Sequence, residues 1–117
     1  MIKHFTDMEV WQLSHALSIE IFGITRELPN SEDYALTSQI RRSANSISAN
    51  ISEAFGRNTK KDKKYFYTIS RGSAFETQNH LLYGTGVHYF EKQISNYLQN
   101  EYNELIHQLN KIMKSLS

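Results

Sequence analysis

Helix-breaking residues are scarce in this sequence, with a single proline and five glycines among 117 residues. Between them lie neither the alternating β-branched pattern of strands nor the dipeptides of tight hairpins. Apolar residues instead recur every three or four positions, which is the spacing of one face of an α-helix. The sequence therefore predicts an all-α fold, and a chain of this length is expected to form one domain, residues 1–117.

The first helix is predicted at residues 7–28. It would open at a capping box formed by Thr6 and Glu9, and Pro29 would prevent its continuation. Its main apolar face comprises Val10, Leu13, Leu17, Ile21, Ile24 and Leu28. A second apolar surface, further round the helix and in need of a cover, comprises Trp11, Ile19 and Phe22.

The second helix is predicted at residues 32–55, with Asn30 or Ser31 as its N-cap and Gly56 as its stop. Its apolar face comprises Leu36, Ile40, Ile47, Ile51 and Ala54. Many small residues lie between these positions, so a neighbouring helix is expected to approach it closely.

Two further helices are predicted at residues 60–87 and 94–115. The first of them begins after Thr59 and weakens at Gly84 and Gly86, and its face would carry Phe66, Ile69, Ser73, Glu76, Tyr83 and Val87. The last helix has an apolar stripe of Ile94, Leu98, Leu105, Leu109, Ile112 and Leu116. Because short connections make successive helices antiparallel, the predicted architecture is an up-down-up-down four-helix bundle.

A line of polar residues shares one face of the second predicted helix, about 100° from the centre of its isoleucine face. The line comprises Gln39, Arg42, Ser46, Asn50 and Glu53, at spacings of three and four residues. We expect an ion pair between Arg42 and Glu76, with Asn50 and Ser73 completing the hydrogen bonds. These residues are interpreted as a structural polar network or a subunit interface.

Charge is unevenly distributed along the chain. Residues 41–71 carry a net charge of +6, while the remaining residues carry −5. Candidate nucleic-acid-binding residues in this segment are Arg57, Lys60, Lys61, Lys63, Lys64 and Arg71. Tyr65 and Tyr67 would offer stacking planes for bases, or else Tyr65 packs in the core and Tyr67 lies on the surface. The alternatives to phosphate binding are a solvated lysine-rich helix start or an acidic partner.

Several classes of function find no support in the sequence. The chain has no cysteine and contains neither a phosphate-binding glycine loop nor a nucleophile-elbow motif. Glu104 and His107 have the spacing of a di-iron ligand pair, but such sites need two copies of the motif. We therefore expect no enzyme, no metal and no other cofactor. Without a membrane-length apolar stretch or a signal peptide, a cytoplasmic protein without membrane contact is expected.

Three segments carry recognisable patterns: FTDMEVW at 5–11, QIRRSANSISANISEAFGR at 39–57 and RGSAFE at 71–76. Together they resemble the ribosomal RNA intervening-sequence proteins, with patterns F-x-x-L-x-V-W, Q-x-R-R-A-x-x-S-I-P-A-N-I-A-E-G and G-S-x-x-E. Ser48 replaces the usual proline and Ala54 the usual glycine. Both changes should leave the second helix straighter and its end less sharply specified.

The resemblance implies a four-helix bundle that assembles into a ring-shaped homopentamer, in a family whose molecular role is poorly defined. Some members are encoded inside intervening sequences of large-subunit ribosomal RNA genes. Similar accessory proteins of diversity-generating retroelements engage nucleic acid and a reverse transcriptase. The expected function is that of a homo-oligomeric scaffold or adaptor, with a protein partner, and the alternative is an RNA-binding accessory protein that uses the basic segment.

Overall fold

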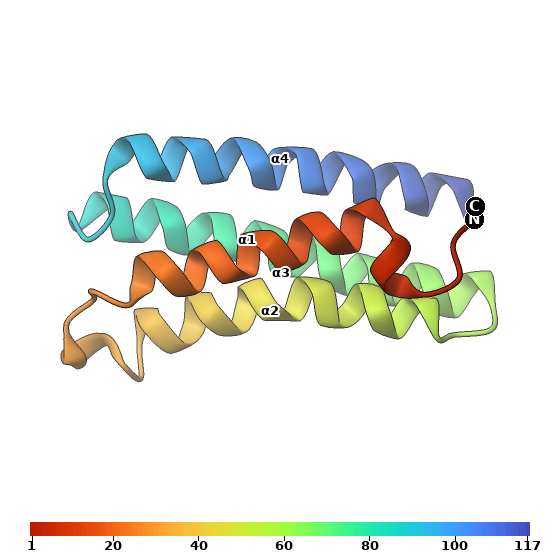
Figure 1. Cartoon of the computed structure of the whole chain (residues 1–117), viewed down its shortest axis with the longest axis horizontal. Helices are drawn as coiled ribbons and strands as arrows, with labels where there is room; N and C mark the ends of the chain where they lie inside the picture. The colour runs from red at the N-terminus through yellow and green to blue at the C-terminus, as the bar shows by residue number, and fades with distance from the viewer.

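The computed structural model describes residues 1–117 and contains four α-helices and no strand. The helices are α1 (Glu9–Thr25), α2 (Leu36–Phe55), α3 (Lys60–Gly86) and α4 (Lys92–Ser115). They run antiparallel in a bundle 43 Å long, with both chain termini at one end (Figure 1). The prediction of an all-α four-helix bundle is confirmed. None of the four helices combines enough length and apolar character to cross a membrane.

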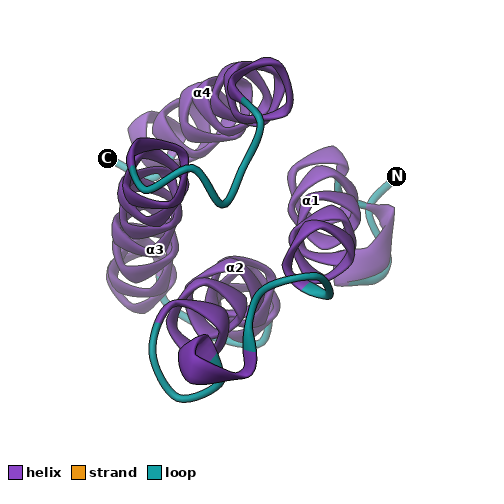
Figure 2. Ribbon diagram, turned by 90° about the vertical axis from the view of Figure 1, so that its left-hand side faces the viewer, coloured by secondary structure: helices purple, strands orange, loops and turns teal.

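The bundle is not equally tight on all sides. Viewed along its length, α2 lies between α1 and α3, and α3 lies between α2 and α4 (Figure 2). Helices α2 and α3 make the most extensive contact, whereas α1 and α4 touch least. The bundle thus has a closed α2–α3 side and, across from it, a more open α1–α4 side.

Helix α1 is shorter than predicted at both ends. The carboxylate of Asp7 accepts hydrogen bonds from the backbone N–H groups of Lys3 (2.9 Å) and His4 (3.0 Å). These bonds fold residues 5–7 into a separate 3₁₀ turn, so α1 begins at Glu9 and the predicted capping box at Thr6 is wrong.

Helix α2 begins four residues later than predicted. Residues Asn30–Glu32 form a 3₁₀ turn after Pro29. From this turn the Glu32 carboxylate accepts a hydrogen bond from the Leu36 N–H at 3.1 Å. The predicted N-cap at Asn30 or Ser31 is therefore wrong. The bounds of α3 and α4 agree with prediction to within two residues, and the Thr59 hydroxyl caps α3.

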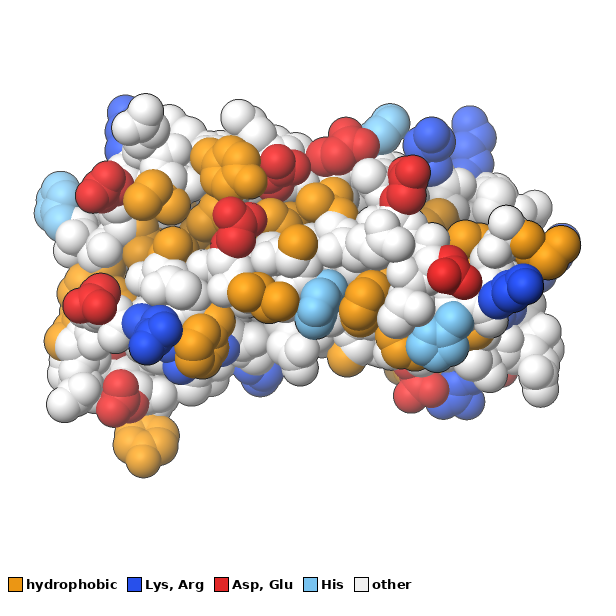
Figure 3. Space-filling model, in the orientation of Figure 1, with side chains coloured by type: hydrophobic (Ala, Val, Ile, Leu, Met, Phe, Trp, Pro, Cys, Tyr) orange, Lys and Arg blue, Asp and Glu red, His pale blue; other side chains and the backbone are white.

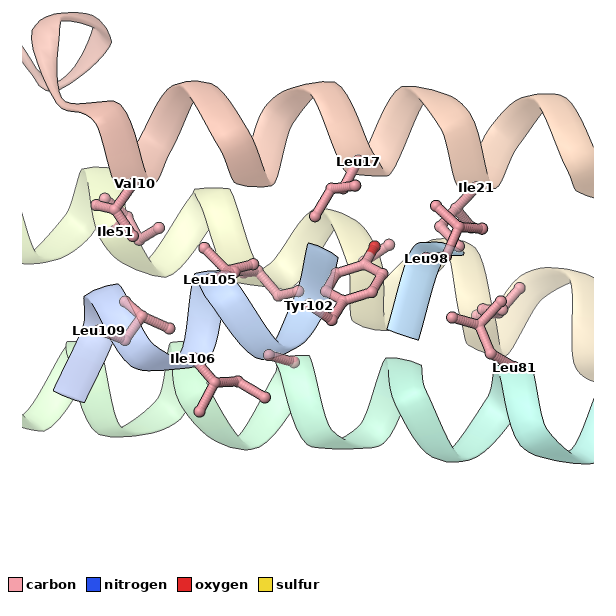
Figure 4. Packing of buried hydrophobic residues seen from close by; sticks show 14 of the residues in the cluster. Val10, Leu17, Ile21, Ile51, Leu81, Leu98, Tyr102, Leu105, Ile106 and Leu109 are labelled. Atoms are coloured by element: carbon pink, nitrogen blue, oxygen red, sulfur yellow. The ribbon is translucent and has the colours of Figure 1, made fainter. Parts of the chain in front are cut away.

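A single core of 19 buried apolar side chains runs along the bundle axis. Figure 4 shows Val10, Leu17 and Ile21 of α1 pointing into the bundle, with Ile51 of α2 beside Val10 and Leu98 of α4 beside Ile21. The whole predicted apolar face of α2 is buried. In α4 the centre of the predicted stripe is buried, whereas Ile94 at its start is 40% exposed.

The predicted core face of α3 is only partly correct: Ser73 is buried and Phe66 packs against the core, but the rest of the face differs. The residues that α3 buries are Tyr67, Ser70, Ser73, Ala74, Thr77, Leu81 and Gly84. Tyr83 and Val87, predicted to face inward, are 55% and 43% exposed. Likewise Tyr67 is buried and Tyr65 is 61% exposed, the reverse of the interpretation that places Tyr65 in the core. The reason is that α3 approaches α2 through small and hydroxyl side chains, which hydropathy periodicity does not mark as core.

The turn between α3 and α4 depends on Gly84. The helix continues through Gly84 and ends at Gly86, and the backbone N–H of Tyr89 donates back to the Gly84 carbonyl at 2.8 Å. His88 takes a left-handed conformation with φ of 68°. This reversal lays the buried Phe90 ring directly on Gly84, where a Cβ atom would lie 2.3 Å from Phe90 Cε2.

Candidate functional site

Most of the predicted polar line lies along the outer edge of the α2–α3 contact, where it meets polar residues of α3. We call this group the polar seam. It comprises Gln39, Arg42, Ser46 and Asn50 of α2 with Ser73, Glu76 and His80 of α3.

The charged part of the polar seam contains the predicted ion pair. Arg42 Nη2 donates to Glu76 Oε2 and, at 3.1 Å, to Gln39 Oε1. His80 Nε2 lies 3.2 Å from the same Glu76 oxygen. The Arg42 and Glu76 side chains are 54% and 37% exposed, and such surface pairs contribute only about 0–1 kcal/mol. This ion pair is therefore too weak to explain the fold by itself.

The neutral part of the polar seam is centred on Ser46. Its hydroxyl accepts hydrogen bonds from Asn50 Nδ2 and from the Ser73 hydroxyl, both at 3.0 Å. Asn50 and Ser73 thus bond to Ser46 and not to the ion pair. Glu53, the last residue of the predicted line, lies apart from this group and faces Arg57, 3.6 Å from its Nε.

A buried row of polar contacts beneath the seam was missed from the sequence. The Ser43 and Thr77 hydroxyls are 2.8 Å apart, and the Ser70 hydroxyl donates to the Ile47 carbonyl at 2.9 Å. Because each buried hydroxyl has a partner, these small residues join α2 to α3 without an unsatisfied group. The helical spacing of these serine and threonine residues is visible in the sequence, but it does not show that they are buried, because serine and threonine are also common on exposed helix faces.

A surface hollow of about 580 Å³ adjoins the charged part of the seam. It is lined by Glu32, Ala35, Leu36, Gln39, Asn79, His80, Leu82 and Tyr83. A second hollow of about 350 Å³ lies between the N-terminal segment and α4, where Glu104 and His107 line it. Nowhere do three or more histidine, aspartate or glutamate side chains gather as metal ligands would.

The predicted basic residues cluster around the α2–α3 turn, but several already have partners. Lys63 Nζ donates to the carbonyls of Ala54 and Phe55 at 3.1 and 3.2 Å, where it caps the end of α2. Arg71 Nη1 donates to Asn110 Oδ1 at 2.8 Å. Lys63 and Arg71 thus have structural partners, which leaves them less available to phosphates than predicted.

The other four basic residues are exposed. The Arg57 guanidinium stacks over the Phe66 ring at 4.6 Å, and Lys64 Nζ donates to the Ser117 hydroxyl at 3.0 Å. Lys60 and Lys61, in the first turn of α3, make no side-chain hydrogen bond or ion pair. The exposed Tyr65 follows them in α3. Because Lys63 and Arg71 already have partners, fewer of the predicted basic residues are open to a ligand than expected.

On the open α1–α4 side, Glu20 of α1 is close enough to Glu101 of α4 to be affected by its charge. Burial, with a smaller contribution from the negative charge of Glu101, raises the pKa of the Glu20 carboxyl. The charge of Glu20 in turn raises the pKa of the exposed Tyr97 hydroxyl. Burial is also the main reason that the pKa of Tyr102 is raised, and its fully enclosed hydroxyl has no hydrogen-bond partner.

The raised pKa of Tyr102 predicts a loss of stability in alkali. Above about pH 10 the unfolded chain loses this phenolic proton while the folded chain keeps it, so the free energy of unfolding should fall by up to about 1.4 kcal/mol per pH unit. Tyr102→Phe should remove this part of the fall and leave the parts due to Tyr67, Tyr89 and Tyr97, whose pKa values are also raised. Urea unfolding between about pH 9 and about pH 11 measures it. Tyr34→Phe, at a side chain 97% exposed, is the control, and equal slopes for both variants would refute the assignment.

Comparison with known proteins identifies a family and a solved structure that are similar to this chain. The family model described as 23S rRNA-intervening sequence protein matches residues 6–111. A solved structure from Bacteroides thetaiotaomicron VPI-5482, described as a protein with unknown function from the S23 ribosomal protein family, superposes with a TM-score of 0.81. That protein is 24% identical in sequence, and the match covers 90% of this chain and 98% of the other. No curated protein is detectably similar in sequence.

Four antiparallel helices joined by a polar α2–α3 seam define this chain as an all-α bundle protein. Within that class, it belongs to the 23S rRNA-intervening sequence protein family, whose model spans nearly its whole length. The resemblance seen in the sequence motifs is thereby confirmed. The similar solved structure is itself described as being of unknown function.

Proposed function

We propose that this protein is a non-enzymatic, self-assembling helical scaffold or adaptor. The observation that supports this is the amount of apolar surface left open on more than one side of the bundle. On α1 and α4 the exposed side chains are Ile19, Ile94 and Tyr97, together with Phe22, which lies beneath the Arg41 guanidinium of α2, and on α3 they are Phe75, Leu82, Tyr83 and Val87. All eight are between 40% and 62% exposed. Figure 3 shows apolar and acidic side chains mixed over the α1–α4 side.

Exposed apolar surface of this extent is typical of a protein interface. Because the two surfaces differ, the simplest association brings one surface of a chain against the other surface of the next. Such head-to-tail contacts form a ring where the rotation closes and a filament where it does not. We propose the closed form, with five chains as the family resemblance implies. A ring would repeat every surface feature of one chain around a common axis, which suits a scaffold.

Light scattering on the purified chain tests the proposed assembly. The expected mass is about five times the 13.6 kDa of one chain. Phe75→Ser and Ile19→Ser should each lower the assembled mass while leaving helical content unchanged. Tyr34→Ser is the matched control, since Tyr34 is 97% exposed in the connection between α1 and α2. A wild-type chain that stays monomeric at high concentration would overturn the proposal.

RNA binding is the second candidate, favoured by the unpartnered Lys60 and Lys61 at the start of α3. Their ammonium groups would neutralise phosphates, and a ring would multiply weak contacts. Binding to mixed-sequence RNA should weaken steeply as salt rises, and Lys60→Glu with Lys61→Glu should abolish it. Arg26→Glu with Lys92→Glu makes the same charge change at the other end of the bundle and should reduce binding less. Binding indifferent to salt and to both lysines would exclude this role.

A further inference from the structure

The most unusual group of titratable residues outside the polar seam is the carboxylate pair between α1 and α4. Neither Glu20 nor Glu101 has a basic side chain within 4 Å. Glu101 is half-buried, and Glu20 is partly desolvated and close enough to Glu101 for that negative charge to help raise its pKa. Carboxylates placed in this way gain from a cation that the chain itself does not supply.

A second observation at the same place is the hydroxyl of Tyr102. The Tyr102 side chain is fully buried, and its hydroxyl has no hydrogen-bond partner within the chain. Figure 4 shows this oxygen pointing from α4 toward α1, and it lies within the field of the Glu20 charge. An unpaired buried hydroxyl is rare in folded proteins. Thus the two carboxylates without a basic partner lie outside a core that holds a hydroxyl without a hydrogen-bond partner.

The polar seam carries a cation with free donors. Arg42 is 54% exposed, and its hydrogen bonds to Gln39 and Glu76 use Nε and Nη2, so that Nη1 is free. A guanidinium has five N–H donors in a planar fork that matches a carboxylate. Arg42 can therefore keep its partners on its own chain and still bind a carboxylate of another molecule.

The two groups lie at matching heights along the bundle. Arg42 is six residues from the start of α2, and Glu20 is five residues from the end of α1. These helix ends are joined by one connection at the same end of the bundle (Figure 1). At 1.5 Å of rise per residue, both side chains lie about 8–9 Å from that end, and Glu101 lies about 14 Å from the adjacent start of α4.

The two groups also lie on opposite sides of the bundle. Figure 2 shows the α2–α3 side facing away from the α1–α4 side. A second copy beside the first, with its axis parallel and turned about that axis by the rotation that closes the ring, would therefore bring its polar seam toward the carboxylate pair at the correct height. The apolar side chains flanking both groups would be covered by the same contact.

We propose that Arg42 of one copy binds Glu20 and Glu101 of the next copy, and that this contact fixes the register of head-to-tail assembly. The inference rests on the proposed self-assembly and names its polar contact. The occupant of the α1–α4 side is a second copy of this chain, because charge, height and direction all match a group that every copy carries.

A charge swap tests the contact. Glu20→Arg with Glu101→Arg should weaken self-association by at least about tenfold, because both cations would face Arg42 of the neighbour. Adding Arg42→Glu with Glu76→Arg to this double variant reverses the charges of the contact, keeps an ion pair within the seam, and should restore assembly to within about threefold of wild type. Glu27→Arg with Asp33→Arg, at two exposed residues in the connection between α1 and α2, makes the same charge change outside the contact, is the control and should assemble normally. Sedimentation velocity measures association, and circular dichroism confirms that each variant is helical.

The possible outcomes separate the two proposals. If wild type is monomeric, the proposed self-assembly itself fails. If wild type assembles and the double variant assembles equally well, only the Arg42 contact is overturned. A folded charge-reversed variant that associates no better than the double variant also overturns it. If the arginine variants do not fold, Glu20→Gln with Glu101→Gln keeps the shapes, and unchanged association of this variant would likewise refute the contact.

Discussion

Replacing Gly84 by alanine is expected to lower the free energy of unfolding by about 3 kcal/mol. A Cβ atom at this position would lie 2.3 Å from Cε2 and 2.4 Å from Cδ2 of Phe90, well inside van der Waals contact. Phe90 is 7% exposed and is held by the turn that returns to the Gly84 carbonyl, so its ring can move only if the α3–α4 turn opens. Overpacking of this kind typically costs 1–3 kcal/mol. Urea unfolding at a fixed chain concentration measures the change, because association also contributes to stability.

The same substitution elsewhere in α3 should have the opposite effect. Gly72 is exposed, and a Cβ atom added there meets nothing within 4 Å. Gly72→Ala should therefore stabilise the chain by about 0.5–1 kcal/mol, since alanine favours the helix and restricts the unfolded chain. In a chain that already carries Phe90→Ala, the ring is absent, and Gly84→Ala should lower the free energy of unfolding much less than it does in wild type. A Gly84→Ala variant as stable as wild type would show that the glycine is not required by this contact.

The second large effect is expected at the centre of the α2–α3 contact. Ala74 is fully buried, one position from the seam residue Ser73, in the row where small side chains bring the two helices together. Ala74→Leu inserts three heavy atoms into this contact and should lower the free energy of unfolding by about 3 kcal/mol. The separation of the helices should also break the buried hydrogen bonds between Ser43 and Thr77 and between Ser70 and the Ile47 carbonyl.

Ala49→Leu is the matched control, because Ala49 lies on the exposed side of α2. It should change stability by less than about 0.5 kcal/mol. Hydrogen exchange of the α2 and α3 backbone amides provides a second measurement, since a looser contact should increase exchange in both helices. Equal stability of the Ala74→Leu and Ala49→Leu variants would mean that the close approach of α2 and α3 is not important for the fold.

The sequence predicted the helices best where one physical signal acted alone. The isoleucine face of α2 is buried as expected, because large apolar side chains at helical spacing form one continuous face that is stabilised by leaving water. Thr59 caps α3 as expected, since its hydroxyl acts on its own helix. The predicted first turn of α1 failed because Asp7 bonds to Lys3 and His4, a local competition that hydropathy does not register.

The candidate site was only partly predictable. The helical spacing of Arg42 and Ser46 indicated a shared polar face, and Arg42 does pair with Glu76 of α3. The role of Lys63 was not visible, because its ammonium caps the end of a different helix. Glu20 and Glu101 are 81 residues apart in the sequence, so that no local pattern relates them.

By itself, the sequence determined that the chain is helical, where its four helices lie to within a few residues, and to which family it belongs. Each of these depends on spacing along the chain and on local backbone chemistry. Only the tertiary structure decided which face of α3 is buried, because that face consists of small and hydroxyl residues whose burial depends on the shape of α2. It also decided that unpaired carboxylates lie on one side of the bundle and Arg42 on the other, since the direction of a side chain in space follows from how all four helices pack together.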